Sequence, residues 1–186
     1  MKRLTLPLSE NDVRSLHAGE QVLLSGSILT GRDVAHKRMC ELMDRGAELP
    51  CPLAGEAIYY VGPTPAMPGK AVGSAGPTTS VRMDKYAPRL IECGLRAMIG
   101  KGNRGEAVIE AMQRFGCVYF AAIGGAGALL AQRINNLEVL AWDELGCEAL
   151  RRISVTDFPV IVAIDTHGHN LYTEGPAAWQ NNISQY

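Results

Sequence analysis

The sequence predicts an α/β protein: one domain with a largely parallel or mixed sheet, flanking helices and a compact β/β/α arrangement. Apolar, strand-like segments alternate with amphipathic, helix-like segments along most of the 186 residues, and this alternation is typical of α/β folds. The nearly all-apolar run at 158–164 indicates a strand buried on both faces. The first third of the chain is richer in strands and loops than a simple doubly wound fold, which favours the β/β/α arrangement.

The first half of the chain contains two predicted strands around one predicted helix. "QVLLSGSI" (21–28) is rich in β-branched and apolar residues and ends in small ones, as strands do. Apolar residues recur at helical spacing over 29–46, which predicts an amphipathic helix that ends at Gly46. "EAIYYVGP" (56–63) reads as a strand closed by Gly-Pro. Residues 64–76 hold too much Gly and Pro for regular structure beyond a short extended piece.

The second half continues the alternation. The predicted elements are a helix at 83–93, a strand at 95–100, a helix at 104–116, a strand at 117–124, a short helix at 125–134, a strand at 137–142, a helical turn or two at 143–153 and a strand within 158–168. The last residues, 174–186, are polar and show no period, so we expect a surface tail or a docking segment there.

Composition excludes several classes of protein. Hydrophobic residues make up 47% and charged residues 20%, with a net charge of -1, so no basic surface for nucleic acid is expected. No apolar run is long enough for a membrane span, and residues 1–13 lack the apolar core of a signal peptide. The cysteines are scattered and form no CxxC pair, which favours reduced, partly buried thiols in a cytoplasmic protein over disulfides or a metal site within this chain. They are Cys40, Cys51, Cys93, Cys117 and Cys147.

Three predicted strand-to-helix turns share a design, because each carries a cation at the start of a helix. "LTGRD" contains Arg32, "GPTTSVRMD" contains Arg82, and "IGKGNRGE" contains Lys101. Free amides and the helix dipole favour an anion at such a position. In α/β folds, ligands bind outside the carboxyl ends of strands, which is where all three turns lie.

Side-chain caps are expected in the same turns. Thr30 and Asp33 have the spacing of a capping box, and Asn103 and Glu106 have cap spacing as well. The hydroxyls of "GPTTS" can cap the next helix, and Asp84 is expected to support the first turn of its own helix.

Two arginines and a lysine suit a ligand with two carboxylates, because an arginine can hold a carboxylate through two parallel hydrogen bonds. The small residues of "VGSAGPTTS" would let such a ligand approach the backbone amides closely. Phosphate is the competing anion. The sequence contains no GxxxxGKS or GxxxxGKT loop, which disfavours a nucleotide phosphate.

Seven motifs occur in order along the chain: "SGSILTGRDVAHKRM", "YYVGPTP", "VGSAGPTTSVRMDKY", "MIGKGN", "FAAIGGAGALLA", "EVLAWDELGCEA" and "FPVIVAIDTHGHNLY". In these motifs, and over about residues 5–173, the chain resembles the β subunit of two-subunit class I fumarate hydratases, which corresponds to the C-terminal domain of the single-chain enzymes. It is also similar to the β subunit of L(+)-tartrate dehydratase. Two of the motifs, "TGRDVAHKRM" and "AIGGAGALLA", look more like the fumarase.

The resemblance implies a swivelling β/β/α domain and the reversible hydration of fumarate to (S)-malate. It implies a 4Fe-4S cluster on a separate α subunit, with one iron open to substrate, which agrees with the scattered cysteines of this chain. The active site would form between the subunits, so this chain alone is expected to be inactive. A hetero-oligomer of the α2β2 type is the family expectation.

The resemblance also implies roles for individual residues. Arg32, Arg82 and Lys101 match positions that hold the substrate carboxylates, and the hydroxyls of Thr78 and Thr79 line the same turn.

Two residues are candidates for the proton transfer. Thr78 matches the residue that handles the C3 proton of malate, and His36 matches a histidine sometimes assigned as the acid/base. A threonine is a poor base unless a neighbouring cation lowers its pKa, and Arg82 is the candidate cation. Histidine has the more convenient pKa. We favour Thr78 and keep His36 as the alternative.

Simpler interpretations exist for most of these features. His36 can be an ordinary histidine at a helix boundary, and the threonines can be plain caps. The glycines of "GGAG" (124–127) fit tight packing better than a dinucleotide site, because GxGxxG is not completed. "DTHGHN" (165–170) is expected to be a structural turn near the subunit boundary, with Asp165 and His167 in a supporting role.

Two other functions compete with the fumarase reading. One is tartrate dehydratase, whose substrate has one more hydroxyl, and the other is a stand-alone carboxylate-binding module without a catalytic partner.

Overall fold

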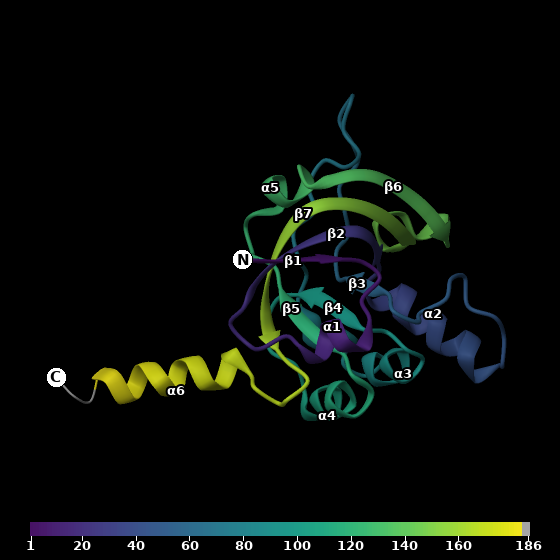
Figure 1. Cartoon of the computed structure of the whole chain (residues 1–186). Helices are drawn as coiled ribbons and strands as arrows, with labels where there is room; N and C mark the ends of the chain where they lie inside the picture. The colour runs from purple at the N-terminus through teal and green to yellow at the C-terminus, as the bar shows by residue number, and fades with distance from the viewer. Residues whose placement is uncertain (184–186) are drawn as a thin grey trace.

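A computed structural model describes the backbone of residues 1–183 and the side chains of residues 1–180 (Figure 1). Its described residues form one seven-stranded sheet in the order β1-β2-β3-β4-β5-β7-β6. The first five strands in this order pair in parallel. The strands are β1 (Lys2–Thr5), β2 (Gln21–Thr30), β3 (Ala57–Tyr59), β4 (Ala97–Gly100), β5 (Val118–Ala121), β6 (Ile134–Ala141) and β7 (Leu150–Ile164).

The long strand β7 closes the sheet into a small barrel. It pairs antiparallel with β2 along most of its length, and its other edge pairs first with β6 and then with β5. The register of β2 against β7 shifts between Leu24 and Gly26. Gly26 has a φ of +122°, and a Cβ there would lie 2.8 Å from the carbonyl oxygen of Leu6. Only glycine suits this bend, which lets β2 curve around the barrel.

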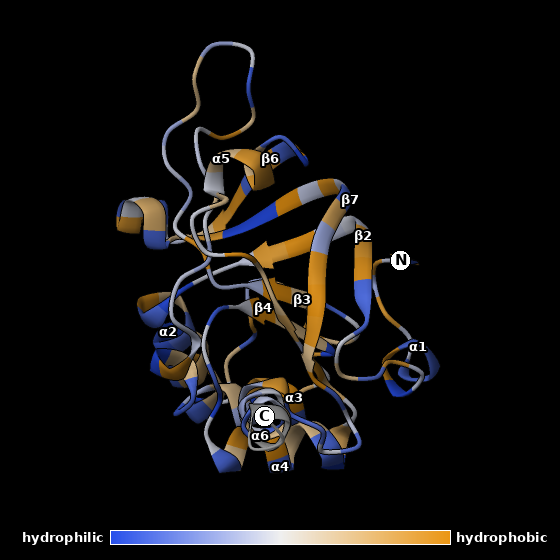
Figure 2. Cartoon of the chain, turned by 90° about the vertical axis from the view of Figure 1, so that its left-hand side faces the viewer, coloured by the Kyte–Doolittle hydropathy of each residue, from blue (hydrophilic) through white to orange (hydrophobic). Residues whose placement is uncertain are grey.

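Two hydrophobic cores lie on the two faces of the sheet, because successive strand residues point to opposite faces. In β4, Ala97 and Ile99 belong to the core inside the barrel, while Met98 belongs to the core under the helices. The same alternation places Tyr59 inside the barrel and Ile58 outside it. Figure 2 shows the resulting apolar colouring along β2, β3, β4 and β7.

Helices cover the outer face of the parallel strands. Residues of α2, α3 and α4 fill the second core, and Figure 1 shows these helices on one side of the barrel, with α6 projecting away from it. The helices are α1 (Glu10–Arg14), α2 (Asp33–Asp44), α3 (Ala87–Glu92), α4 (Glu106–Phe115), α5 (Gly127–Ala131) and α6 (Leu171–Ile183), with 3-10 turns η1 (Ser80–Met83) and η2 (Asp143–Glu148). None of the described helices is long and apolar enough to cross a bilayer.

The predicted α/β class, mixed sheet and flanking helices are confirmed. The helical turns predicted over 143–153 are wrong beyond residue 148, because β7 begins at Leu150. There, Leu150, Ile153 and Val155 are buried between β2 and β6, so sheet pairing overrides the local pattern. The strand β1 and the helix α1 had no predicted counterpart.

The C-terminal segment forms a helix where the sequence shows no period. Helix α6 runs to Ile183 and contains Pro176. Residues 173–180 of this helix are exposed. An exposed helix does not need an apolar stripe, so the sequence carried no periodic pattern from which the helix could be predicted. Residues 184–186 of the expected surface or docking tail lie outside the described residues.

We predict that Gly100→Ala destabilises the protein. A Cβ on Gly100 would collide with the hydroxyl of Ser80 and lie 3.0 Å from the ring of Tyr60. Overpacking of this kind costs about 1–3 kcal/mol in the free energy of unfolding, measurable by urea denaturation. Gly175→Ala is the matched control, because a Cβ on Gly175 meets no atom within 4 Å. Equal unfolding free energies for the two variants would contradict the predicted clash.

Candidate functional site

The three cationic turns meet at one edge of the sheet. Arg32 follows β2 and Lys101 follows β4, and these parallel strands end on the same side. Residues 78–80 lie parallel to Lys101: the N–H of Ser80 donates to the Lys101 carbonyl at 2.9 Å, and the N–H of Lys101 donates to the Thr78 carbonyl at 3.3 Å. Arg82 joins the first turn through an ion pair with Asp33 at 2.9 Å. Segments far apart in the sequence therefore form one site.

Arg82 lies against the hydroxyl of Thr78. Its Nη2 atom donates to Thr78 Oγ1 at 3.2 Å. Thr78 is half-buried, and its N–H donates to the Tyr60 carbonyl at 2.8 Å, which fixes the backbone below the hydroxyl. Thr79 is exposed beside it. A guanidinium ion this close to a hydroxyl favours the ionised form of that hydroxyl.

Arg32 is held by a carboxylate from the opposite side of the site. Its Nη2 atom lies 3.2 Å from Glu148 Oε1, and both side chains are 23% exposed. A Cβ on Gly62 would lie 2.9 Å from Arg32 Nη1, so a glycine at position 62 leaves the space that the guanidinium occupies. Glu148 comes from η2, near the end of the "DELGCEA" motif.

Lys101 differs from the two arginines. It is exposed, and within the described part of the chain its ammonium group makes no ion pair and no hydrogen bond. Its side chain passes Gly124, with Cδ at 3.8 Å from where a Cβ of that glycine would be. Lys101 thus supplies the uncompensated positive charge of the site.

His36 lies beneath the site rather than on its surface. The imidazole is fully buried, with its Nδ1 atom 2.7 Å from the Arg32 carbonyl and its ring edge-on to Tyr60 at 5.2 Å between centroids. Its Nε2 atom has no partner among the described residues. Burial lowers the pKa of His36 to about 4. The histidine is therefore neutral near pH 7 and supports the backbone at Arg32.

The expected caps are wrong. Helix α2 begins after Arg32 without a side-chain cap, and Thr30 is the last residue of β2, where sheet pairing fixes it. Helix α4 begins after Gly105, not near Asn103. Asp84 accepts the N–H of Gly105 at 2.6 Å, so it supports the first turn of α4 rather than that of its own helix.

Several supporting residues were not identified from the sequence, because their partners are distant along the chain. The Tyr119 hydroxyl bonds with Ser80 Oγ at 2.8 Å and donates to the Gly102 carbonyl at 2.9 Å. The N–H of Gly102 donates to the Tyr172 hydroxyl at 3.2 Å. Arg104 pairs with Asp84. The one available signal was an arginine inside "GKGNRGE" that the carboxylate-site hypothesis left without a role.

Of the glycines of "GGAG", only Gly127 packs tightly as predicted, and it packs against a loop rather than a strand; a Cβ on Gly125 would meet no atom within 4 Å. A Cβ on Gly127 would lie 2.9 Å from the amide nitrogen of Gly76, and the N–H of Ala75 donates to the Gly127 carbonyl at 3.0 Å. The "DTHGHN" segment is a structural turn, in which Asp165 accepts the N–H groups of His167 at 2.8 Å and His169 at 3.1 Å.

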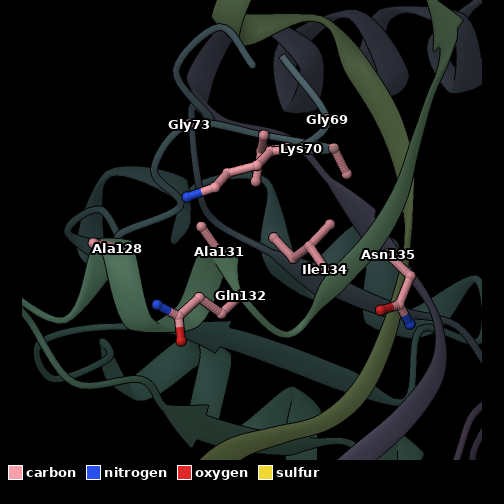
Figure 3. Close-up of a pocket in the computed structure, with 10 residues that line it drawn as sticks. Gly69, Lys70, Gly73, Ala128, Ala131, Gln132, Ile134 and Asn135 are labelled. Carbon is pink, nitrogen blue, oxygen red and sulfur yellow. The ribbon is translucent and has the colours of Figure 1, made fainter. Parts of the chain in front are cut away.

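A cavity of about 450 Å³ lies elsewhere, between the loop 69–73, helix α5 and the start of β6. Its polar side chains are Lys70, Gln132 and Asn135 (Figure 3). None of the candidate site residues lines it.

The cysteines do not gather. All five are free; Cys40, Cys51 and Cys117 are buried, and Cys93 and Cys147 are exposed. Among the described residues, no three His, Cys, Asp or Glu side chains come together as metal ligands. The donor set of this chain does not fit an iron–sulfur cluster, which needs clustered thiolates.

The structure is an α/β domain with three cationic side chains at one edge of its sheet, two of them following the carboxyl ends of parallel strands, where α/β domains commonly bind their ligands. The family model described as "Fumarase C-terminus" matches residues 1–175, and the chain belongs to that family. It is 40% identical over 176 residues to the anaerobic class I fumarate hydratase of Escherichia coli K12, covering 94% of this chain and 31% of the relative.

Two further relatives differ in how much of their length this chain covers. Fumarate hydratase 2 of Leishmania major is 39% identical over 158 residues, covering 84% of this chain and 28% of the relative. The L(+)-tartrate dehydratase subunit beta of Escherichia coli K12 is 36% identical over 178 residues, covering 93% of this chain and 87% of the relative. The chain thus spans about a third of the fumarate hydratases it matches, and most of the tartrate dehydratase subunit.

We predict that His36 makes stability fall with acid. Its pKa is lowered from 6.5 to about 4 by burial, so the unfolded chain binds a proton that the folded chain does not. The contribution of the neutral His36 to the free energy of unfolding is fully present above pH 6.5 and is lost as the pH falls towards 4. The loss is about 2 kcal/mol between pH 7 and pH 5.

The test is urea unfolding of wild type and His36→Asn at several pH values. Asn keeps an N–H for the Arg32 carbonyl but does not titrate, so this part of the pH dependence should vanish. His17→Asn, on the exposed surface, is the control. An unchanged pH slope in His36→Asn would contradict the assignment.

Proposed function

We propose that this chain is the β-type subunit of a hydro-lyase that interconverts fumarate and (S)-malate. The single observation that carries the proposal is the Arg82–Thr78 contact of 3.2 Å, on a turn that is hydrogen-bonded to Lys101. Membership of the fumarase C-terminal family and 40% identity to a class I fumarate hydratase support it.

In this proposal, Arg32, Arg82 and Lys101 hold the two substrate carboxylates, with Thr79 as a further hydrogen-bond donor. The arginines are already oriented by Glu148 and Asp33. Preorganised cations at the position where negative charge develops are often the largest contribution to catalysis. The uncompensated charge of Lys101 gives an incoming dianion its first attractive partner.

Thr78 is the better candidate for the proton at C3. In dehydration, the C3 proton moves to the ionised Thr78 Oγ1, and the electrons of the C3–H bond form the C2–C3 double bond. The C2–O bond breaks, and hydroxide leaves with its electron pair. Release of the proton from Thr78 restores its ionised form, and one proton taken from solvent converts the hydroxide to water, so the step balances. Arg82 stabilises the ionised Thr78 before the transfer. His36 remains the alternative, but its burial and its low pKa make it the weaker base.

The proposal assigns a 4Fe-4S cluster to a partner α subunit, because the cysteines of this chain do not gather. Such a cluster would supply a Lewis acid for the departing hydroxide. The roles proposed for Arg32, Thr78, Arg82 and Lys101 do not depend on the position of the cluster.

Exposed apolar side chains close to the cationic turns support docking of the partner there. Val81 is 55% and Ile123 62% exposed. Val81 belongs to the Arg82 turn, and Ile123 directly precedes the glycine that Lys101 passes. Burying these side chains against a partner would be favourable, and would convert an open edge into a closed pocket.

The test is anaerobic co-expression with a candidate α subunit, followed by assays with fumarate, (S)-malate and both tartrate enantiomers. We expect fumarate hydration by the complex and none by this chain alone. Arg82→Ala should remove most turnover, by about 100-fold or more, while the complex still assembles. Wild-type rates in Arg82→Ala would reject its role in holding a carboxylate.

Tartrate dehydration is the second candidate. It is favoured by the coverage of 87% of the L(+)-tartrate dehydratase subunit beta, a relative of similar length. Turnover of L(+)-tartrate without turnover of fumarate would select it.

A further inference from the structure

Arg104 is a buried cation without a role in the reaction proposed above. The residue is 4% exposed and its side chain is fully buried. Its guanidinium lies over the rings of Tyr60 and Tyr119, at 5.3 and 5.1 Å from their centroids. Burying an arginine is costly unless it is paired, so its partners indicate what it does.

The partner of Arg104 lies on the turn that carries Thr78 and Arg82. Arg104 Nε lies 2.7 Å from Asp84 Oδ1, and the other oxygen of Asp84 accepts the Gly105 N–H at 2.6 Å. Asp84 directly follows η1. Both carboxylate oxygens are therefore held by the segment that follows Lys101, which ties the end of η1 to the start of α4.

The two terminal nitrogens of Arg104 have weaker hydrogen-bond partners than Nε, which pairs with Asp84. Nη1 donates to the sulfur of Met98 at 3.1 Å, which is a weak acceptor, and Nη2 has no hydrogen-bond partner among the described residues. Burial lowers the pKa of Arg104, but Tyr60 and Asp84 raise it by more, so the group stays charged. A buried ion pair often stabilises a protein no more than apolar side chains of similar size would. The presence of a buried arginine beneath the cationic turns is therefore poorly explained by stability alone.

We propose that Arg104 is the positioning residue that sets the spacing between the Thr78–Arg82 turn and the Lys101 turn. It acts through Asp84 and Gly105 on one side, and through its contact with Tyr119 on the other. Tyr119 in turn bonds to Ser80 and Gly102, one from each turn. The effect of this spacing on catalysis depends on the function proposed above. The effect of Arg104 on the spacing itself does not.

Hydrogen exchange in the full chain tests the spacing without any activity. The reporters are the amides of Ser80 and Lys101, which bond across the two turns. The reference is the amide of Val162, which bonds to the Glu20 carbonyl at 2.9 Å in the barrel. In Arg104→Met, exchange at Ser80 and Lys101 should accelerate by about tenfold or more relative to Val162, because a local link is lost.

Two milder variants cover the case in which Arg104→Met does not fold. Arg104→Lys keeps the charge but not the planar fork, and Asp84→Asn keeps an acceptor for Gly105 but not the ion pair. Arg152→Met is the matched control. This variant breaks the ion pair between Arg152 and Glu56, which are 3.0 Å apart. Glu56 directly precedes β3, so it lies at the end of the strand opposite to the cationic turns.

In the reconstituted complex, Arg104→Lys should weaken inhibition by succinate more than inhibition by propionate. Only a ligand with two carboxylates depends on the spacing between the turns. Arg152→Met should change both inhibition constants equally or not at all. The value of kcat/KM for fumarate should fall by about tenfold or more in Arg104→Lys, as expected for misplaced groups.

The outcomes separate the two proposals. Selective loss of protection at Ser80 and Lys101 supports the positioning role, even if the wild-type complex proves inactive and the proposed function fails. Unchanged protection in the Arg104 variants, or equal acceleration at Val162, overturns it.

Discussion

The candidate site depends on one piece of backbone pairing, in which residues 78–80 extend the sheet alongside Lys101. Two hydrogen bonds, from the Ser80 amide to the Lys101 carbonyl and from the Lys101 amide to the Thr78 carbonyl, fix this register. They bring Thr78, Arg82 and Lys101 to the edge where Arg32 leaves β2. Because the pairing is short, it needs support from both sides. Ser80 fits against Gly100, where no Cβ is tolerated, and Tyr119 bonds to both segments.

The site combines a buried layer of polar side chains, of which only Arg104 is charged, with an exposed layer that carries further positive charge. His36, Tyr60 and Arg104 lie below the surface, with burial above 95%, and hold the turns in place. Arg82, Thr79 and Lys101 face outward, where a ligand can reach them. This division explains why the exposed groups can be arranged for an anion without destabilising the fold. The cost of burying the Arg104 guanidinium is offset in part by its ion pair with Asp84 and by the rings of Tyr60 and Tyr119.

Much of the fold could be predicted from the sequence, because strands buried on both faces and amphipathic helices leave clear patterns. The turn between β2 and α2, with Arg32 at the start of the helix, was predicted correctly for the same reason. Arg82 instead lies in the last turn of η1, which no strand directly precedes, and Lys101 lies four residues before Gly105, after which α4 begins. The caps were not predicted correctly, since Thr30 is held in β2 by its neighbours and Asp84 serves a helix more than twenty residues away. The extent of β7 depended on pairing with β2 and β6, which no local pattern contains. The contacts of Arg104 and Tyr119 could not be predicted, because their partners lie elsewhere along the chain.

The most direct test of the account is proton exchange at C3 of (S)-malate in D₂O, catalysed by the reconstituted complex. If the Thr78 hydroxyl, ionised beside Arg82, takes the C3 proton, Thr78→Ala should slow the exchange by about 100-fold or more, with a much smaller change in KM. Exchange that persists at the wild-type rate in Thr78→Ala, and disappears in His36→Asn, would contradict the account and assign the proton transfer to the histidine.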